Sequence, residues 1–137
     1  MARPLPVLGG ASPCRGFHAM VPGMAKLRLR VDLEPDGQVG PGKIALLELI
    51  DRCGSIAAAG RAMRMSYRRA WELTDSINQC FREPAVSTQL GGTSGGGASL
   101  TPFGRELVKH YRAIEKKAER AAASHLKVLQ SARAGQR

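Results

Sequence analysis

Residues Ser55 to Asn78 have the sequence Ser-Ile-Ala-Ala-Ala-Gly-Arg-Ala-Met-Arg-Met-Ser-Tyr-Arg-Arg-Ala-Trp-Glu-Leu-Thr-Asp-Ser-Ile-Asn. Ser55 is a good N-cap for an alanine-rich helix to about Met63, and a second helix is expected from near Ser66 to about Phe81. At about 100° per residue, the apolar side chains of the second helix share one side and its charged side chains share the other. Two helices joined by so short a turn predict a helix-turn-helix, whose second helix can enter the DNA major groove.

Upstream of this stretch, the pattern first alternates and then becomes helical. Apolar and charged residues alternate strictly from Leu27 to Leu33, which predicts a half-buried strand. Residues 34–42 are rich in Pro and Gly and are expected to form a turn region. Apolar residues then recur at helical spacing from Ile44 to Ile50, and Gly54 marks the end of this predicted helix.

Downstream, residues 85–90 and 98–101 are two short strand-like pieces on either side of a glycine-rich segment, residues 91–97. Five of the seven residues in that segment are glycine, which favours a β-hairpin of the kind called a wing. The tip residues Thr93 and Ser94 could contact DNA phosphates or form a plain loop, and the sequence leaves both interpretations open.

A long helix is predicted after the hairpin. Thr101 and Pro102 supply an N-cap and a first-turn proline, and apolar residues then recur at steps of three and four along residues 103–132. A helix of about 30 residues spans roughly 45 Å, which is more than so small a domain can cover. We therefore expect an identical helix from a second chain to pair with it, although the part beyond Ala121 could instead be a frayed basic tail. The predicted dimer interface consists of Leu107, Tyr111, Ile114, Ala118, Ala121 and His125.

These patterns together predict a fold that is mainly α with a small β wing. A winged helix-turn-helix domain is expected over residues 25–102, followed by a long C-terminal dimerisation helix over residues 103–132. Residues 1–24 are expected to be a disordered leader and residues 133–137 a disordered tail.

Composition points to a polyanionic partner. The 137 residues carry a net charge of +10 with a pI near 10.4, and 137 residues suffice for one domain. Residues 53–82 hold five basic and two acidic groups, and residues 101–137 hold nine and three. No apolar run approaches the roughly 18 residues of a membrane span, so a soluble, cytoplasmic protein with no membrane partner is expected.

Catalytic and metal chemistry are not suggested. The three histidines, His18, His110 and His125, lie in the N-terminal segment or on the long helix, without a nucleophile and base nearby in the pattern. The three cysteines lack the spacing of a zinc site or a disulfide framework, so reduced thiols are expected. We therefore predict a protein that is not an enzyme and that has no metal or cofactor.

With these patterns, the chain resembles the N-terminal DNA-binding domain of ModE-type molybdate-responsive regulators. That domain is related to the winged helix of LysR-type regulators. The resemblance covers residues 26–125 and depends most on the Ser-Tyr-Arg-Arg-Ala-Trp run, residues 66–71, together with the spaced glycines of the wing. It implies a homodimeric transcription regulator that binds double-stranded DNA. Full-length members continue into molybdate-binding domains, whereas this sequence ends at Arg137, so molybdate is not expected to bind this chain. The wing tip also lacks the Lys or Arg commonly found between the glycine pairs.

The predicted contacts to DNA cluster on the helix-turn-helix. Arg68 and Arg69 are the candidates for reading guanine, because bidentate Arg–guanine pairs are the commonest specific contact. Glu72 could accept from a cytosine amino group or pair with Arg68 one turn away, while Trp71 is expected to pack structurally. The full set of candidates is Ser55, Arg61, Arg64, Ser66, Tyr67, Arg68, Arg69, Glu72, Thr93 and Ser94.

The predicted function is therefore sequence-specific DNA binding by a homodimer. The alternative is a dimeric adaptor that uses the same helix to bind protein.

Overall fold

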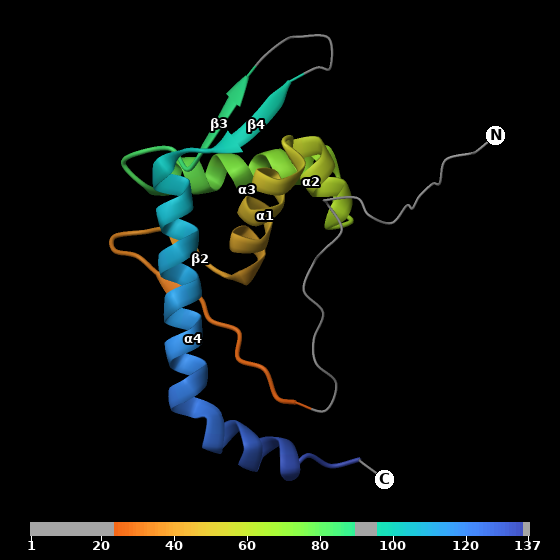
Figure 1. Ribbon diagram of the computed structural model, residues 1–137, viewed down its shortest axis with the longest axis vertical. Coiled ribbons are helices and arrows are strands. Elements are labelled where there is room, and N and C mark those ends of the chain that lie inside the picture. The colour runs from red at the N-terminus through yellow and green to blue at the C-terminus, as the bar shows by residue number, and fades with distance from the viewer. Residues whose placement is uncertain (1–23, 90–95, 136–137) are drawn as a thin grey trace, which may run out of the picture.

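The computed structural model describes residues 24–89 and 96–135 (Figure 1). Within these ranges it contains four helices and two separate two-stranded antiparallel sheets. In chain order the elements are β1 (Val31–Asp32), β2 (Gln38–Val39), α1 (Pro41–Cys53), α2 (Ile56–Ala62), α3 (Tyr67–Cys80), β3 (Val86–Gln89), β4 (Gly97–Leu100) and α4 (Pro102–Ser131).

Helix α1 lies at the centre of the molecule. It contacts α2, α3, α4 and β4, and it therefore buries apolar side chains on several sides: Ile44, Leu46, Leu47, Leu49 and Ile50. Gly54 ends the helix with a φ of 79°, and its N–H donates to the carbonyl of Ile50. A left-handed residue at this position favours glycine, so the predicted end of the first helix is confirmed.

Helices α2 and α3 form the predicted helix-turn-helix. The Ser55 hydroxyl accepts from the N–H of Ala58 at the start of α2, and the Ser66 hydroxyl accepts from the N–H of Arg69 at the start of α3. A Cβ at Gly60 would lie 2.9 Å from the Cβ of Ala70, so small residues are needed where the two helices cross. Both predicted N-caps and the approximate bounds of both helices are confirmed.

Strands β3 and β4 form the hairpin that extends from the helical cluster (Figure 1). Val86 pairs with Leu100 at the base of the hairpin, where both side chains are buried. The side chain of Asn78 joins the hairpin to α3, since its Oδ1 accepts from the N–H groups of Ala85 and Val86. Its Nδ2 donates to the carbonyl of Val86, so one side chain satisfies three backbone groups. The predicted strands of the wing are confirmed.

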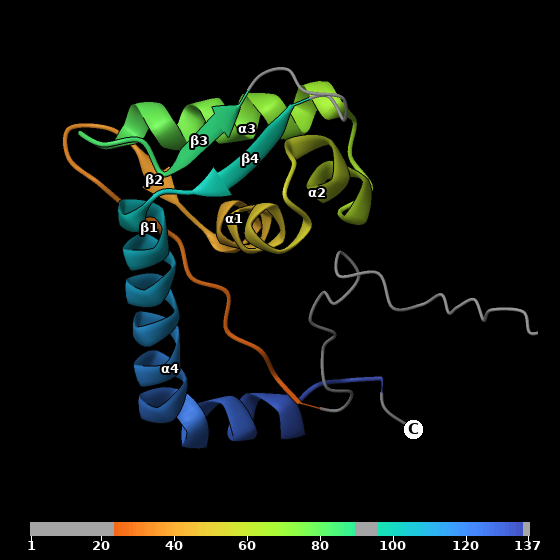
Figure 2. The same ribbon diagram turned by 45° about the horizontal axis from the view of Figure 1, so that its top comes forward.

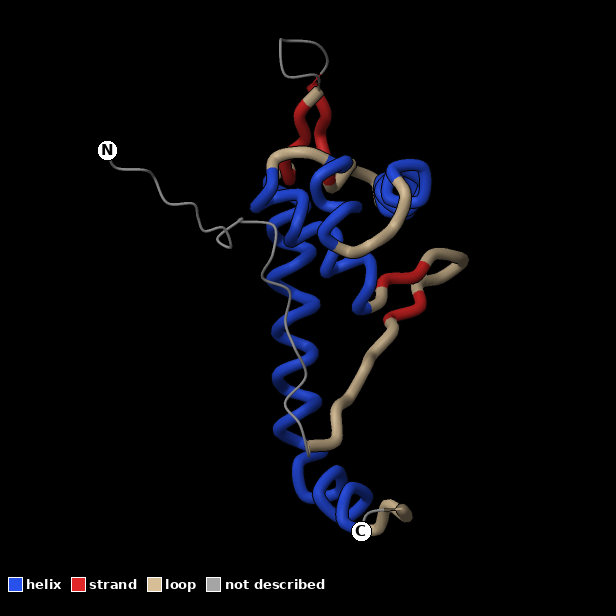
Figure 3. The backbone as a smooth tube through the Cα atoms, turned by 90° about the vertical axis from the view of Figure 1, so that its right-hand side faces the viewer, coloured by secondary structure: helices blue, strands red, loops and turns tan. Residues whose placement is uncertain are grey.

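The N-terminal strand is shorter than predicted. Side chains alternate between exposed and half-buried from residue 26 to residue 33, as expected, but only Val31–Asp32 pairs with another strand. Its partner, Gln38–Val39, lies in the segment expected to be a turn. Residues 24–30 instead run extended from β1 toward the far end of α4 (Figure 3). Close to β1, the carbonyl of Leu29 accepts a hydrogen bond from the hydroxyl of Tyr111 in the first half of α4. An alternating pattern indicates that one side of an extended segment is buried, but it does not say what buries that side. Here part of it is buried by a helix and not by a second strand.

Helix α4 has 30 residues and begins as predicted, with the Thr101 hydroxyl accepting from the N–H of Gly104. Its first turns pack against the domain, where Tyr111 is 2% exposed. The last part of the helix bends away from the axis of the first part (Figure 2). The helix is therefore present with nearly the predicted bounds, but it is not one straight rod.

Several predictions lie outside the described residues: the structure of residues 1–23, the wing tip with Thr93 and Ser94, and residues 136–137. Cys53 is disulfide-bonded and Cys80 is a free thiol, so the expectation of reduced cysteines is wrong for Cys53. Among the helices of the described segments, none has the length and apolar character of a membrane span.

Candidate nucleic-acid interface

The first turn of α3 presents polar and aromatic side chains to solvent. Ser66, Tyr67, Arg68 and Arg69 are all exposed, and 57% of the Tyr67 surface is accessible. The cap made by Ser66 fixes where the helix begins and therefore where the following three side chains point. The opposite side of α3 buries Ala70, Thr74 and Ile77 in the core. The structure thus brings the predicted recognition residues together on one exposed turn.

Arg68 and Glu72 form an ion pair on the outer side of α3. The Arg68 Nε lies 3.3 Å from a carboxylate oxygen of Glu72, and the two side chains are 86% and 50% exposed. The pair is one of the two alternatives that the sequence leaves open for Glu72. Such an exposed pair contributes little stability, so Arg68 can exchange the carboxylate for a base edge or a phosphate at small cost.

The other predicted basic contacts are also exposed. Arg61 lies in the last turn of α2, and Arg64 occupies the turn before α3 with a φ of 60°. Of the four arginines between residues 61 and 69, only Arg68 takes part in an ion pair among the described residues. Ser55 is half-buried, and its hydroxyl already accepts from the N–H of Ala58. The helix-turn-helix therefore offers three uncompensated guanidinium groups on one part of the surface.

Trp71 was expected to pack structurally, but it is not buried in the core. It is 46% exposed, because it follows Ala70 by one residue and, at about 100° per residue, lies at the border of the apolar side of the helix. Trp71 precedes Asn78 by seven residues, which is two turns of helix, so both lie on the side of α3 that faces the wing. The sequence prediction missed this surface because the border position allowed either burial or exposure.

Arg30 and Lys43 were also missed. With Arg69 they line a concavity of about 420 Å³ beside the N-terminal half of α3. Arg30 is paired with Asp32 through a contact of 2.9 Å, and Lys43 donates to the carbonyl of Gln38. No local signal in the sequence places these residues beside α3, because the segment before β1 and helix α1 reach it only in the folded chain.

The residues predicted for the dimer interface do not form one continuous surface. Tyr111 is buried in the chain's own core and donates a 2.6 Å hydrogen bond to the carbonyl of Leu29, and Leu107 is half-buried against the same core. Ile114 is 44% exposed, while Ala118 is half-buried. Ala121 and His125 are exposed further along the helix. The first part of the seam therefore packs within the chain, and only the later part is available to a partner.

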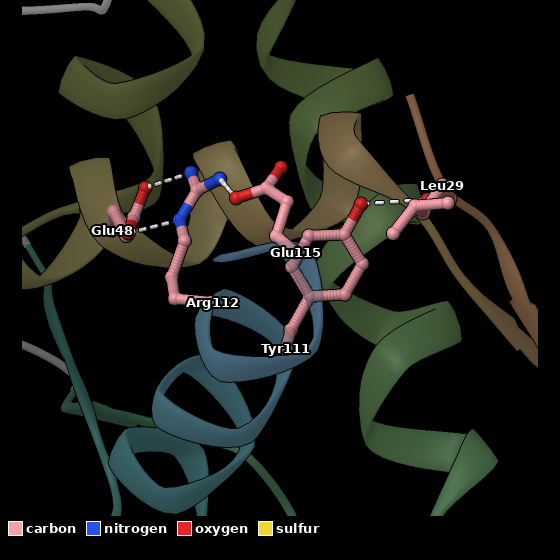
Figure 4. Close-up of polar contacts among 5 residues, drawn as sticks. All are labelled: Leu29, Glu48, Tyr111, Arg112 and Glu115. Carbon is pink, nitrogen blue, oxygen red and sulfur yellow. Dashed lines mark hydrogen bonds and ion pairs between the residues drawn. The ribbon is translucent and has the colours of Figure 1, made fainter. Parts of the chain in front are cut away.

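A charged cluster attaches α4 to α1 (Figure 4). The Nε and one terminal nitrogen of Arg112 donate to the two carboxylate oxygens of Glu48 at 2.9 and 2.6 Å, and the other terminal nitrogen donates to Glu115 at 2.6 Å. The hydrogen bonds to Glu48 raise the pKa of Arg112 above its usual value, although burial acts in the opposite direction. Burial and the nearby Glu115 raise the pKa of Tyr111, against the effect of Arg112. This cluster fixes the first half of α4 against α1.

The arrangement of the elements is consistent with a winged helix: a helix-turn-helix, an antiparallel hairpin held to its second helix, and a central helix behind both. Exposed arginines gather on the helix-turn-helix and not on the hairpin strands.

Comparison with known proteins finds several that are similar to this chain. The chain is 40% identical over 88 residues to the molybdenum transport protein ModE of Azotobacter vinelandii, a match that covers 64% of this chain and 33% of that protein. It is 44% identical over 86 residues to the molybdenum-pterin-binding protein MopB of Rhodobacter capsulatus, covering 62% and 32%. It is 33% identical over 87 residues to the DNA-binding transcriptional dual regulator ModE of Escherichia coli K12, covering 64% and 33%.

Over the matched residues, the chain is similar to ModE-type molybdate-responsive regulators. The match spans only about a third of the length of these relatives. No protein-family model matches the chain.

Proposed function

We propose that this chain is a sequence-specific DNA-binding transcription regulator that acts as a homodimer. The observation that carries the proposal is the first turn of α3, where Arg68 and Arg69 are exposed beside a capped helix start. Arg61 and Arg64 lie just before it and would contact phosphates, with Ser66, Tyr67 and Glu72 completing the contacts in the groove. Ser55 and the wing-tip residues Thr93 and Ser94 remain proposed phosphate contacts.

The dimer would form through the later part of α4. Ile114 begins the exposed part of the predicted seam, and Val128 and Leu129 near the end of the helix are each 66% exposed. Exposed apolar side chains on one helix favour a partner of the same kind, and a two-fold axis would place two α3 helices about 34 Å apart. The operator would then be an inverted repeat whose half-sites are separated by about one helical turn.

The relatives support the regulatory class because curated proteins named as transcriptional regulators match this chain at 30–34% identity. A regulator of this kind would act in the cytoplasm on double-stranded DNA without catalysing a reaction. Molybdate binding by these 137 residues is not part of the proposal. The proposed boundaries are residues 25–102 for the winged domain and residues 103–132 for the dimerisation helix.

One observation favours the alternative of a protein-binding adaptor. Residues 84–100, which include both wing strands, contain no charged residue, whereas a DNA-binding wing gains affinity from Lys or Arg. An adaptor would instead use the exposed α3 to bind a partner protein.

Selection from a random duplex library, followed by a salt titration on the selected site, separates the two functions. A DNA-binding regulator should enrich an inverted repeat, and the logarithm of its affinity should fall by about 0.9 per phosphate contact with the logarithm of the salt concentration. A library that yields no enriched sequence, or binding that is insensitive to salt, would reject the DNA-binding function and favour the adaptor.

A further inference from the structure

Trp71 is a large apolar side chain on a helix face that is otherwise polar. Of the six large hydrophobic residues exposed in the described chain, Tyr67 and Trp71 are the two on α3. They are separated by four residues, so their side chains are neighbours on the same side of the helix. The core side of α3 is already filled by Ala70, Thr74 and Ile77. Trp71 therefore has no place in the core and meets solvent or a ligand.

The position of Trp71 also determines what it could meet. Two turns further along the same side of α3, Asn78 holds β3 through hydrogen bonds of 2.8 and 3.0 Å to the N–H groups of Ala85 and Val86. Trp71 thus lies between the exposed first turn of α3 and the hairpin. If α3 occupies the major groove, this side of the helix faces the groove wall nearest to the wing.

The chemistry of the indole limits its function there. It has one N–H donor and no acceptor, so it cannot make the bidentate contacts that distinguish guanine or adenine. The thymine 5-methyl group is the apolar feature that base edges present in the major groove, and contact with it is a known means of recognising thymine. An exposed indole beside Arg68 is suited to that contact.

We propose that Trp71 is a specificity-determining residue that packs against the 5-methyl group of a thymine in each half-site, beside the base read by Arg68 or Arg69. This inference rests on the proposed DNA-binding function and adds a base preference to it. Trp71 would supply apolar contact, while the arginines supply hydrogen bonds.

Replacement of thymine by deoxyuridine tests the proposal, because it removes the methyl group and keeps every hydrogen-bonding group of the base. Each thymine of one half-site of the selected operator is replaced in turn, and the dissociation constant is measured. One position should weaken binding by the wild-type chain about fourfold, the equivalent of one buried methyl group. The variant Trp71→Ala should bind both operators equally, and the control Ser76→Ala, an exposed change elsewhere on α3, should keep the fourfold ratio.

A second measurement needs no substitution. Trp71 is the single tryptophan of the chain, so its fluorescence is free of other indole signals. Quenching by acrylamide should be efficient in the free protein and should be lost on the selected operator.

The proposal is overturned if no thymine position responds to deoxyuridine, if Trp71→Ala keeps the ratio, or if bound operator leaves the quenching unchanged. These results differ from failure of the function itself, in which no operator is selected at all.

Discussion

Helices α3 and α4 are both amphipathic, yet they use their two sides differently. Helix α3 buries one side completely within the domain and leaves the other exposed along its whole length of 14 residues. Helix α4 divides along its length: its first turns are fixed by Gly104, Tyr111 and Arg112, while the side chains from Ile114 onward are largely exposed. The comparison indicates two different uses of exposed surface. The exposed side of a short helix is suited to entering a groove of a ligand, whereas the exposed end of a long helix is suited to pairing with a second chain.

The largest loss of stability is expected from a substitution at the start of α4. A Cβ at Gly104 would collide with the backbone carbonyl oxygen of Ala85, and neither backbone can move without disturbing the wing. We expect Gly104→Ala to lower the free energy of unfolding by about 3 kcal/mol, as overpacking of a tight contact does. Urea denaturation measures this change. Gly42→Ala is the matched control, because a Cβ there meets nothing within 4 Å, and its stability should be unchanged or slightly raised. Equal stability of the two variants would show that α4 is not fixed at this point.

A substitution in the exposed part of α4 should weaken dimerisation and leave the stability of the folded chain unchanged. Ile114→Asp places a charge in the proposed interface and should cost about 2 kcal/mol or more of dimerisation free energy. Because Ile114 is 44% exposed in the single chain, the free energy of unfolding of the monomer should change little. Sedimentation measures the dimerisation constant. Ala123→Asp, nine residues further and on the opposite side of the helix, is the control and should leave the dimer intact. A wild-type monomer at micromolar concentration, or two variants that behave alike, would contradict the role given to α4.

On α3, loss of either exposed arginine should affect recognition alone. Arg68→Ala or Arg69→Ala should cost about 1 to 3 kcal/mol on the selected operator and relax the base preference at one position. Gel-shift titration of operator variants measures both quantities. The control Arg52→Ala removes an exposed arginine from the end of α1 and should lower affinity for all sequences slightly and equally. If both α3 variants bind the operator as the wild type does, α3 is not the recognition helix.

The attached part of α4 should be sensitive to alkaline pH. Tyr111→Phe removes the hydrogen bond to the carbonyl of Leu29 and should cost about 1 kcal/mol. Burial raises the pKa of Tyr111 above 10.0, so the folded chain holds this proton more tightly than the unfolded chain. The stability gained in this way is complete below pH 10 and is lost as the pH rises through the folded pKa. Stability of the wild type should therefore fall more steeply above pH 10 than that of Tyr111→Phe. The exposed Tyr67→Phe is the control, and a wild type whose alkaline profile matches that of Tyr111→Phe would refute this coupling.

Local signals predicted much of this fold, and long-range contacts account for the rest. The caps Ser55, Ser66 and Thr101 and the stop at Gly54 act within a few residues, so the ends of the helices could be read from the sequence. Periodicity also indicated which side of each helix is apolar, but it does not say what covers that side.

Tyr111 illustrates the limit, because its position in the apolar seam is equally consistent with a partner helix and with the residue 29 carbonyl that it contacts. The Arg112–Glu48 pair joins residues that are 64 positions apart, and no sequence pattern in either helix predicts it. In the candidate interface, the Arg68–Glu72 pair could be foreseen as one of two alternatives because both residues lie on one helix. The exposure of Trp71 depends instead on how closely the wing packs.

The smallest effect on stability and on DNA binding is expected from added molybdate. The relatives include a protein named as molybdenum-pterin-binding, so an oxyanion site is a natural question for this chain. A concavity of about 760 Å³ lies between α1, α4 and the N-terminal segment. Its charged lining consists of five basic residues, Lys26, Arg28, Arg52, Arg112 and Lys116, and three acidic residues, Glu48, Glu115 and Glu119. Arg112 is already paired with Glu48 and Glu115, so a dianion could bind its guanidinium only by displacing these carboxylates.

We therefore expect molybdate to change neither the melting temperature nor the operator affinity of the 137-residue chain. A ligand present at a hundred times its dissociation constant would stabilise the folded state by about 2.7 kcal/mol, which a melting scan detects readily. Sulfate serves as the control for general ionic effects. A reproducible rise in melting temperature with molybdate and not with sulfate would mean that these residues form an oxyanion site, contrary to the prediction.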